Sequence, residues 1–263
     1  MRRNSVACVA SGVLLLAASC GGQSASNQTV PVAAGAPVTV EPELKPGDMA
    51  SGTVEIDGVE IDYVAVTPAG FESGDTTPVL LVLPPGSQDL QLTIRFMAGT
   101  YLTEAVARGW VVVSPAAPDG VRYFDGSESL LPGFMEWVAT WVQPEGGGFH
   151  LTGASNGGLS AFRIAGLEPQ RFRSLIVFPG FPYTDADADR LGRLAELPIR
   201  MYVGGDDVQW IDPMADAEMR LSELGADVVL EVFEGEGHTI DSLGDGVRLF
   251  DELDAVRRGL PGG

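Results

Sequence analysis

Apolar strand-like segments alternate with helix-like segments along most of this 263-residue chain. Short apolar runs predict strands at 79–83, 110–114, 149–152, 173–178, 199–203 and 228–233, and the first two are expected to be buried. Between them, helical spacing predicts helices at 90–108, 130–142, 157–165, 187–197 and 214–224, and a last helix within 239–258. Regular alternation of this kind favours an α/β fold, with a mostly parallel central sheet covered by helices on both faces.

An antiparallel hairpin is expected ahead of this alternating part. Residues 53–56 and 59–66 alternate apolar and polar side chains on either side of Asp57-Gly58. Asp-Gly between two such runs is a strong hairpin signal, because both residues tolerate the left-handed backbone that a tight turn requires. The two segments are therefore predicted to pair with each other.

The N-terminal segment has the features of an export signal. Arg2 and Arg3 precede an apolar stretch at 6–18, and small residues then lead into Cys20. This arrangement resembles a bacterial lipoprotein signal peptide at 1–19, which implies cleavage before Cys20 and a diacylglycerol on its thiol. The alternative is a plain secretory signal. Residues 20–50, rich in Gly, Ala, Ser and Pro, are expected to be a flexible tether, and 51–263 a single catalytic domain.

Composition excludes several classes of function. Asp and Glu number 36 against 16 Lys and Arg, a formal charge of −20, which argues against a nucleic-acid partner. Only two cysteines and two histidines are present, so no metal site and no cofactor are expected. Cys8 would leave with the signal peptide, so no disulfide is expected either. No later segment is apolar enough to span a membrane, so the lipid is expected to be the only membrane anchor. The protein is therefore predicted to lie outside the cytoplasm, attached to the cell envelope.

The most specific chemical signal is Gly-Ala-Ser-Asn-Gly at 153–157, which follows a predicted strand and opens a predicted helix. A sharp strand-to-helix turn of this type forces its central residue, Ser155, into strained backbone angles and exposes the hydroxyl. Glycine is needed on both sides because a Cβ there would collide with neighbouring backbone. An ordinary turn with Ser155 as a helix cap is the alternative reading.

A nucleophilic serine needs a base and an orienting acid. His150 lies in the strand before Ser155, too far along the sheet to reach it, and is expected to be structural. His238 follows the last strand and is the candidate base. The acid is expected after strand 199–203, where Asp206 and Asp207 compete. Asp207 is favoured, and the order serine, acid, histidine is then that of the α/β-hydrolases.

From about residue 52 onward the chain resembles the α/β-hydrolase superfamily. The matching pieces are 79–88, GASNGG around Ser155, PQRF at 169–172, VGGDD at 203–207 and GEGH at 235–238. Ser-Asn-Gly-Gly looks most like esterases of the polyhydroxybutyrate depolymerase type. The resemblance implies cleavage of carboxylic esters through an acyl-enzyme. It also implies an oxyanion hole made by the N–H of Asn156 and that of Gly86 or Ser87, because Pro85 has no N–H to donate.

The sequence says less about the substrate. Only about 20 residues separate strand 173–178 from strand 199–203, too few for a cap domain, so an open site is expected for short acyl or polymer-borne esters. Phe181, Tyr183 and Trp210 are candidate pocket residues, and the acidic run at 185–189 is expected to face solvent. A serine peptidase of the same fold, or a catalytically silent binding module, are the alternative functions.

Overall fold

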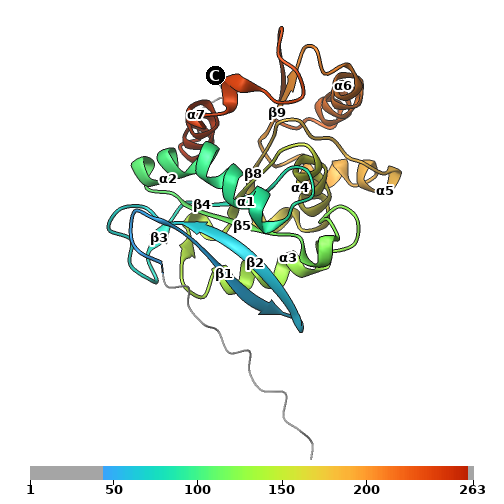
Figure 1. The fold of residues 1–263 in the computed structure, drawn as a ribbon. Helices are drawn as coiled ribbons and strands as arrows, with labels where there is room; N and C mark the ends of the chain where they lie inside the picture. The colour runs from blue at the N-terminus through green and yellow to red at the C-terminus, as the bar shows by residue number, and fades with distance from the viewer. Residues whose placement is uncertain (1–43, 260–263) are drawn as a thin grey trace, which may run out of the picture. The chain divides into compact units, whose positions relative to one another are not determined.

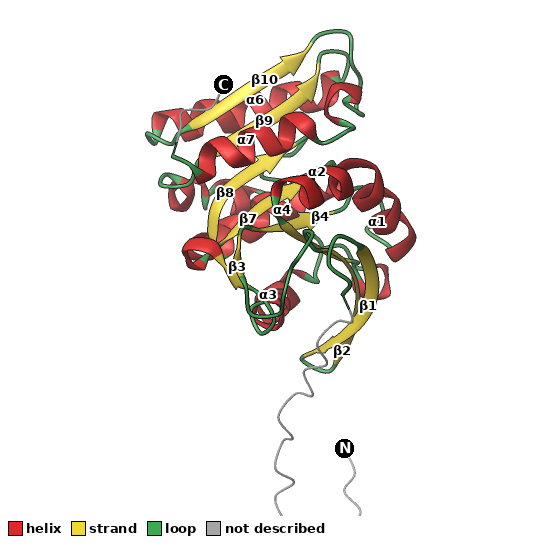
Figure 2. Cartoon of the chain, turned by 90° about the vertical axis from the view of Figure 1, so that its left-hand side faces the viewer, coloured by secondary structure: helices red, strands yellow, loops and turns green. Residues whose placement is uncertain are grey.

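The computed structural model describes residues 44–259. Cys20, the predicted signal peptide and most of the predicted tether lie outside this range. Eight strands form one sheet in the order β1-β2-β5-β4-β7-β8-β9-β10, which Figure 2 shows as a twisted layer between helices. Their bounds are β1 Met49–Ile56, β2 Val59–Val66, β4 Val79–Leu83, β5 Val111–Pro115, β7 Phe149–Gly153, β8 Phe172–Val177, β9 Ile199–Gly204 and β10 Val228–Phe233. Pairings β1–β2 and β2–β5 are antiparallel and all others are parallel.

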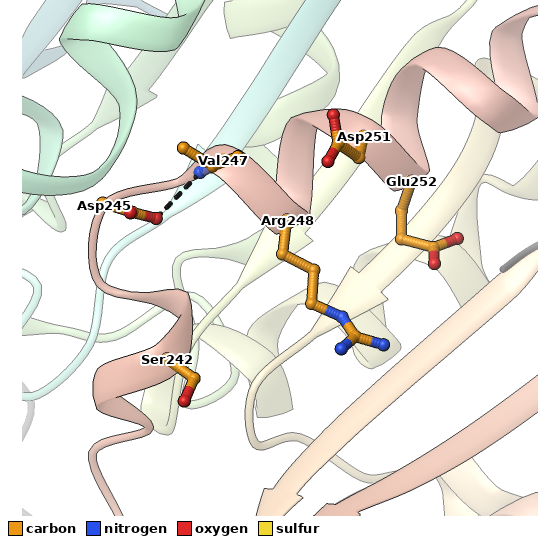
Figure 3. A pocket seen from close by; sticks show the side chains of 6 residues that line it. All are labelled: Ser242, Asp245, Val247, Arg248, Asp251 and Glu252. Atoms are coloured by element: carbon orange, nitrogen blue, oxygen red, sulfur yellow. Dashed lines mark hydrogen bonds between the residues drawn. The ribbon is translucent and has the colours of Figure 1, made fainter.

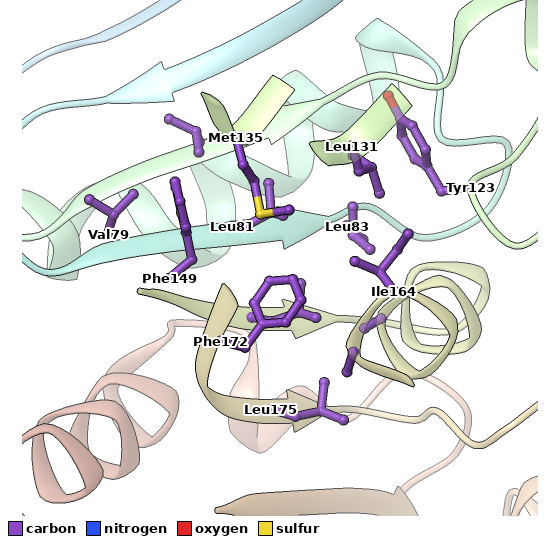
Figure 4. Packing of buried hydrophobic residues seen from close by; sticks show 14 of the residues in the cluster. Val79, Leu81, Leu83, Tyr123, Leu131, Met135, Phe149, Ile164, Phe172 and Leu175 are labelled. Atoms are coloured by element: carbon purple, nitrogen blue, oxygen red, sulfur yellow. The ribbon is translucent and has the colours of Figure 1, made fainter. Parts of the chain in front are cut away.

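Helices cover both faces of the sheet (Figure 1). On one face lie α1 Leu90–Phe96, α2 Leu102–Arg108 and α7 Val247–Arg257; on the other lie α3 Leu131–Val138, α4 Asn156–Leu167 and α6 Val208–Glu223. Successive strand residues point to opposite faces. Leu80 and Val82 therefore pack in the hydrophobic core under α1, α2 and α7. Leu81 and Leu83 pack in the core under α3, α4 and α6, which Figure 4 shows from close by. The predicted mostly parallel α/β sheet is confirmed.

The remaining elements are short. A separate pair of parallel strands joins β3 Thr76–Thr77 to β6 Gln143–Pro144. Helix α5 spans Asp185–Ala188, and 3-10 turns occupy Pro118–Gly120, Glu128–Leu130, Glu145–Gly147, Pro169–Arg171, Leu191–Leu194 and Asp241–Leu243. The segment between β8 and β9 therefore contains one short helix and one 3-10 turn, and no cap domain, as the sequence predicts.

The predicted hairpin is confirmed and is longer than expected. Asp57 and Gly58 have φ values of 52° and 79°, so both turn residues are left-handed. Strand β1 begins at Met49 rather than at 53, and the N–H of Gly47 donates to the carbonyl of Thr67 at 3.1 Å. Backbone pairing with β2 thus continues to Met49, two residues before the catalytic domain was expected to begin.

Four predicted helices differ from those observed. The helix expected at 187–197 is absent, and α5 and the 3-10 turn Leu191–Leu194 occupy that segment instead. The helix expected at 90–108 contains a π-helical segment, Met97–Tyr101, between α1 and α2. The helix expected at 130–142 ends at Val138, and the Thr140 hydroxyl then donates to the carbonyl of Trp137 at 2.6 Å. The helix expected at 214–224 begins six residues earlier, at Val208, with Pro213 inside it.

The acidic run between β8 and β9 is only partly solvated. Asp185 and Asp189 are exposed, but Asp187 is 4% exposed. Its carboxylate accepts from the guanidinium of Arg163 at 2.8 and 3.0 Å and from that of Arg190 at 3.2 Å. The prediction of a wholly solvated face was wrong for Asp187. Its buried negative charge is compensated by Arg163, which is distant in the sequence, and by Arg190, which is three residues further along the chain.

Candidate active site

Ser155 occupies a strained turn between β7 and α4. Its backbone has φ 54° and ψ −120°, a region that non-glycine residues rarely enter. A Cβ on Gly153 would collide with the carbonyl of Gly157, and a Cβ on Gly157 would collide with that of Leu83. The Ser155 N–H donates to the carbonyl of Pro179 at 2.8 Å, which holds the turn against the loop after β8. The predicted backbone strain and the need for both glycines are therefore observed.

The structure brings Ser155, Asp207 and His238 together. The parallel register aligns the carboxyl ends of β7, β9 and β10, and each strand is followed within a few residues by one of the three side chains. Nδ1 of His238 lies 2.7 Å from a carboxylate oxygen of Asp207, and Nε2 lies 2.8 Å from Oγ of Ser155. An ionised carboxylate can only accept, so Nδ1 carries the proton and Nε2 is left to accept the serine hydroxyl proton.

Of the two adjacent acids, it is Asp207 that contacts the imidazole. Its side chain is 11% exposed and it directly precedes α6. Asp206 is exposed, and its N–H donates to the carbonyl of Glu236 at 2.9 Å. One residue of offset in the loop after β9 thus points one carboxylate toward His238 and leaves the other in solvent.

His150 lies away from the site, as the strand geometry predicts. It is 2% exposed, its Nδ1 is 2.7 Å from Oγ of Ser174, and its ring packs edge-on against Trp110. Desolvation, followed by the positive charges of Arg173 and Arg257, lowers the pKa of His150 to about 4. The imidazole is therefore neutral at pH 7 and part of the core.

The loop after β4 packs against the turn that carries Ser155. The side-chain amide of Asn156 donates to the carbonyl of Gly86 at 2.8 Å. Gly86 has φ 59°, and both Gly86 and Ser87 are exposed. As the first residue of α4, Asn156 has no intrahelical partner for its N–H. The three predicted oxyanion residues thus lie on two segments joined by a direct hydrogen bond.

A buried glutamine, missed at the sequence level, clamps this loop. Gln88 is fully buried and has φ 59°. Its amide nitrogen donates to the carbonyl of Pro84 at 3.0 Å and to Oγ of Ser160 at 3.2 Å, while its oxygen accepts from the N–H of Tyr123 at 2.9 Å. The Ser160 hydroxyl in turn donates to the carbonyl of Asn156 at 2.9 Å. A polar residue in a Pro-Gly loop gave no signal that it would be buried.

The predicted pocket residues divide into two groups. Trp210 lies 5.0 Å from the His238 ring between centroids, and Phe181 packs edge-on against Trp210 at 5.1 Å. Tyr183 is 54% exposed and contacts Phe124 instead. None of the three lines the cavity beside Ser155.

That cavity has a volume of about 220 Å³. It is lined by Pro85, Phe96, Thr100, Ala154, Ser155, Phe178, His238, Thr239, Ile240, Leu243 and Gly244. Most of these residues come from α1, the π-helical segment and the loop after β10, which sequence spacing could not bring together.

A larger surface hollow, of about 490 Å³, lies elsewhere, along the start of α7 (Figure 3). Its lining includes three acidic residues, Asp245, Asp251 and Glu252, beside Arg248. Within residues 44–259, no group of three or more His, Cys, Asp and Glu side chains is placed to hold a metal ion. In the same range, no helix is both long and apolar enough to cross a membrane.

Comparison with solved structures shows the fold. The chain is similar to an α/β serine hydrolase without lid from Xanthomonas campestris (20% identity, TM-score 0.58, 84% of this chain and 100% of that one). It is also similar to an S-formylglutathione hydrolase from Agrobacterium tumefaciens, with 16% identity and a TM-score of 0.61 over 82% of this chain and 95% of that one. A thermostable esterase is similar too, with 17% identity and a TM-score of 0.58 over 80% of this chain, which spans 62% of the esterase. No protein-family model matches the sequence, and no curated protein matches it significantly. The chain therefore has the α/β-hydrolase fold without a cap domain.

Proposed function

We propose that this protein is a serine hydrolase that cleaves carboxylic esters, with Ser155 as nucleophile, His238 as base and Asp207 as the orienting acid. The observation that carries the proposal is the chain of hydrogen bonds from Asp207 through His238 to a serine on a strained turn. The similar solved structures include esterases and serine hydrolases, which supports the reaction class. The Ser-Asn-Gly-Gly sequence favours an esterase of the polyhydroxybutyrate depolymerase type.

The mechanism follows from the proton positions. Oγ of Ser155 attacks the ester carbonyl as Nε2 of His238 takes its proton, and the C–O bond to the alcohol breaks as the imidazolium returns that proton to the leaving oxygen. Water then attacks the acyl-enzyme by the same path and releases the acid. Asp207 keeps the proton on Nδ1 and stabilises the imidazolium formed in each step.

The negative charge on the carbonyl oxygen requires two donors. The N–H groups of Asn156 and of Gly86 or Ser87 are proposed to supply them, since the Asn156 amide ties the two segments together. Each such donor typically contributes about 3 kcal/mol to the transition state. The N-terminal end of α4 adds a favourable dipole at the same place.

Labelling with a fluorophosphonate, together with a panel of p-nitrophenyl esters and p-nitroanilides, tests the proposal. The wild type should be labelled and should hydrolyse esters, and Ser155→Ala should lose both properties. Ser222→Ala, on the exposed surface of α6, is the matched control and should behave as the wild type. Equal turnover by wild type and Ser155→Ala would refute the catalytic role, and preferential anilide cleavage would identify a peptidase instead.

A second proposal concerns location. The N-terminal sequence supports export and lipid attachment at Cys20, so the ester substrate would be met outside the cytoplasm. The experiment is mass spectrometry of the membrane fraction. A diacylated peptide beginning at Cys20 is expected, and an unmodified peptide spanning the predicted cleavage point would refute it.

A further inference from the structure

We infer that the cavity beside Ser155 holds the acyl group of the substrate and restricts it to an uncharged apolar group of about four to six carbon atoms, or a single aromatic ring. This inference rests on the proposed function, because it assumes that Ser155 carries the acyl group. It adds a substrate class and names Phe96 as the side chain that limits chain length.

The chemistry of the walls excludes charged acyl groups. Phe96, Phe178, Ile240 and Leu243 supply apolar surface, and His238 is the only lining residue with a titratable side chain. A carboxylate or ammonium on the acyl chain would lose its hydration and would meet no Lys, Arg, Asp or Glu side chain there, only the hydroxyls of Thr100 and Thr239 besides the Ser155–His238 pair. A branched, linear or aromatic hydrocarbon group would instead gain from leaving water.

The size of the cavity limits the length of the chain. Its volume is about 220 Å³, and a water-sized group takes roughly 30 Å³. The space therefore accommodates about seven non-hydrogen atoms, which is a short acyl chain with its carbonyl or one phenyl ring. A fatty-acyl chain of about twelve carbons would not fit and would have to extend into solvent. Each methylene group left exposed would forgo the roughly 0.8 kcal/mol of binding free energy that burial in a larger pocket would supply.

The walls are backed by the core, so the cavity cannot deepen easily. Phe96 packs against Tyr101 at 5.3 Å and Phe178 at 6.0 Å between centroids, and Tyr101 packs against Phe250. Ile240 and Leu243 are 4% and 0% exposed. Phe96 itself is half-buried at the end of α1, where it both lines the cavity and contacts this packed group. Its removal is the change that enlarges the cavity most directly.

The part of His238 outside the cavity is assigned to the leaving alcohol. Trp210 packs on the imidazole, Phe181 packs on Trp210, and neither lines the cavity. The His238 side chain is 44% exposed, so an alcohol that leaves through its exposed part meets no similar limit of size, which suits polymer-borne esters.

The experiment measures kcat/KM for p-nitrophenyl esters of two to twelve carbons, for the benzoate and for the hemisuccinate. The wild type should be fastest at about four to six carbons, with the twelve-carbon ester and the hemisuccinate each roughly 100-fold slower. Phe96→Ala should move the optimum to longer chains and raise the ratio of twelve-carbon to four-carbon turnover at least about tenfold. Phe96→Leu, a smaller change, should move it in the same direction and guards against misfolding of the alanine variant.

Phe181→Ala, an aromatic side chain near the site that does not line the cavity, is the matched control. Its chain-length optimum should equal that of the wild type, whatever its overall rate. An unchanged optimum in both Phe96 variants, a shifted optimum in Phe181→Ala, or a wild-type preference for long or charged acyl groups would overturn the inference. Absence of all ester turnover and of fluorophosphonate labelling would instead refute the proposed function, so the two failures are distinguishable.

Discussion

The buried amide of Gln88 is expected to hold in place the loop after β4, which carries the proposed oxyanion donors Gly86 and Ser87. The variant Gln88→Met tests this. Methionine keeps the length of the side chain but removes both polar atoms. Three hydrogen bonds are lost, to the carbonyl of Pro84, to Oγ of Ser160 and from the N–H of Tyr123. At about 1 kcal/mol for each bond, the free energy of unfolding should fall by about 3 kcal/mol, since the Pro84 carbonyl and the Tyr123 N–H are left buried without a partner.

The loss should also reach the chemistry. Pro84 lies two residues before Gly86, and Ser160 bonds the carbonyl of Asn156, so Gln88 is connected to both segments that supply the proposed oxyanion donors. Displacement of one donor costs about 100- to 1,000-fold in kcat, and a loosened loop should cost about 10- to 100-fold, with KM changed only a few-fold.

The assay combines urea denaturation, steady-state ester hydrolysis and the inhibition constant of a trifluoromethyl ketone. A role limited to stability would leave kcat and the inhibition constant unchanged under conditions where the variant is folded. Gln170→Met, on the exposed surface, is the control and should be neutral in all three measurements. Loss of stability with full retention of kcat would refute the reasoning.

Three further predictions follow from the same structure. Asp207→Asn should lower kcat by about 10,000-fold while Asp206→Asn stays within about threefold, and the reverse order would move the acid role to Asp206. His150 is neutral in the fold with a pKa of about 4 and titrates near 6.5 when unfolded, so the unfolded state binds more protons between these values. Wild-type stability should therefore fall by about 3 kcal/mol as pH drops from 7 to 4, more than in His150→Gln, as measured by urea denaturation at each pH. Gly157→Ala should abolish most activity because its Cβ would collide with the carbonyl that ends β4, whereas Gly99→Ala, with nothing near its Cβ, should keep the wild-type rate and melting temperature.

Much of the architecture could be predicted from local patterns. The inner parallel strands β4 and β7 are apolar runs because helices cover both faces of the sheet there, whereas the edge strand β10 is only partly buried. The Asp57-Gly58 hairpin was also predictable, since its turn depends on two adjacent residues. Helix ends were predicted less well. The π-helical segment at Met97–Tyr101 and the early start of α6 depend on tertiary packing rather than on spacing.

The sequence by itself determined which residue types were available for catalysis. With two histidines, one of them inside a strand before Ser155, only His238 could act as the base. Glycine spacing around Ser155 likewise required a tight turn, because only glycine fits where backbones approach so closely.

Tertiary structure alone decided the rest of the site. The sequence favoured Asp207 over Asp206, but which carboxylate contacts His238 depends on one residue of offset in a loop, which neither composition nor periodicity encodes. Gln88 and the walls of the cavity come from segments separated by up to about 150 residues, and their contacts exist only because parallel strands end at one edge of the sheet. Short-range patterns determine local backbone, whereas a pocket is a property of segments that meet only after the chain has folded.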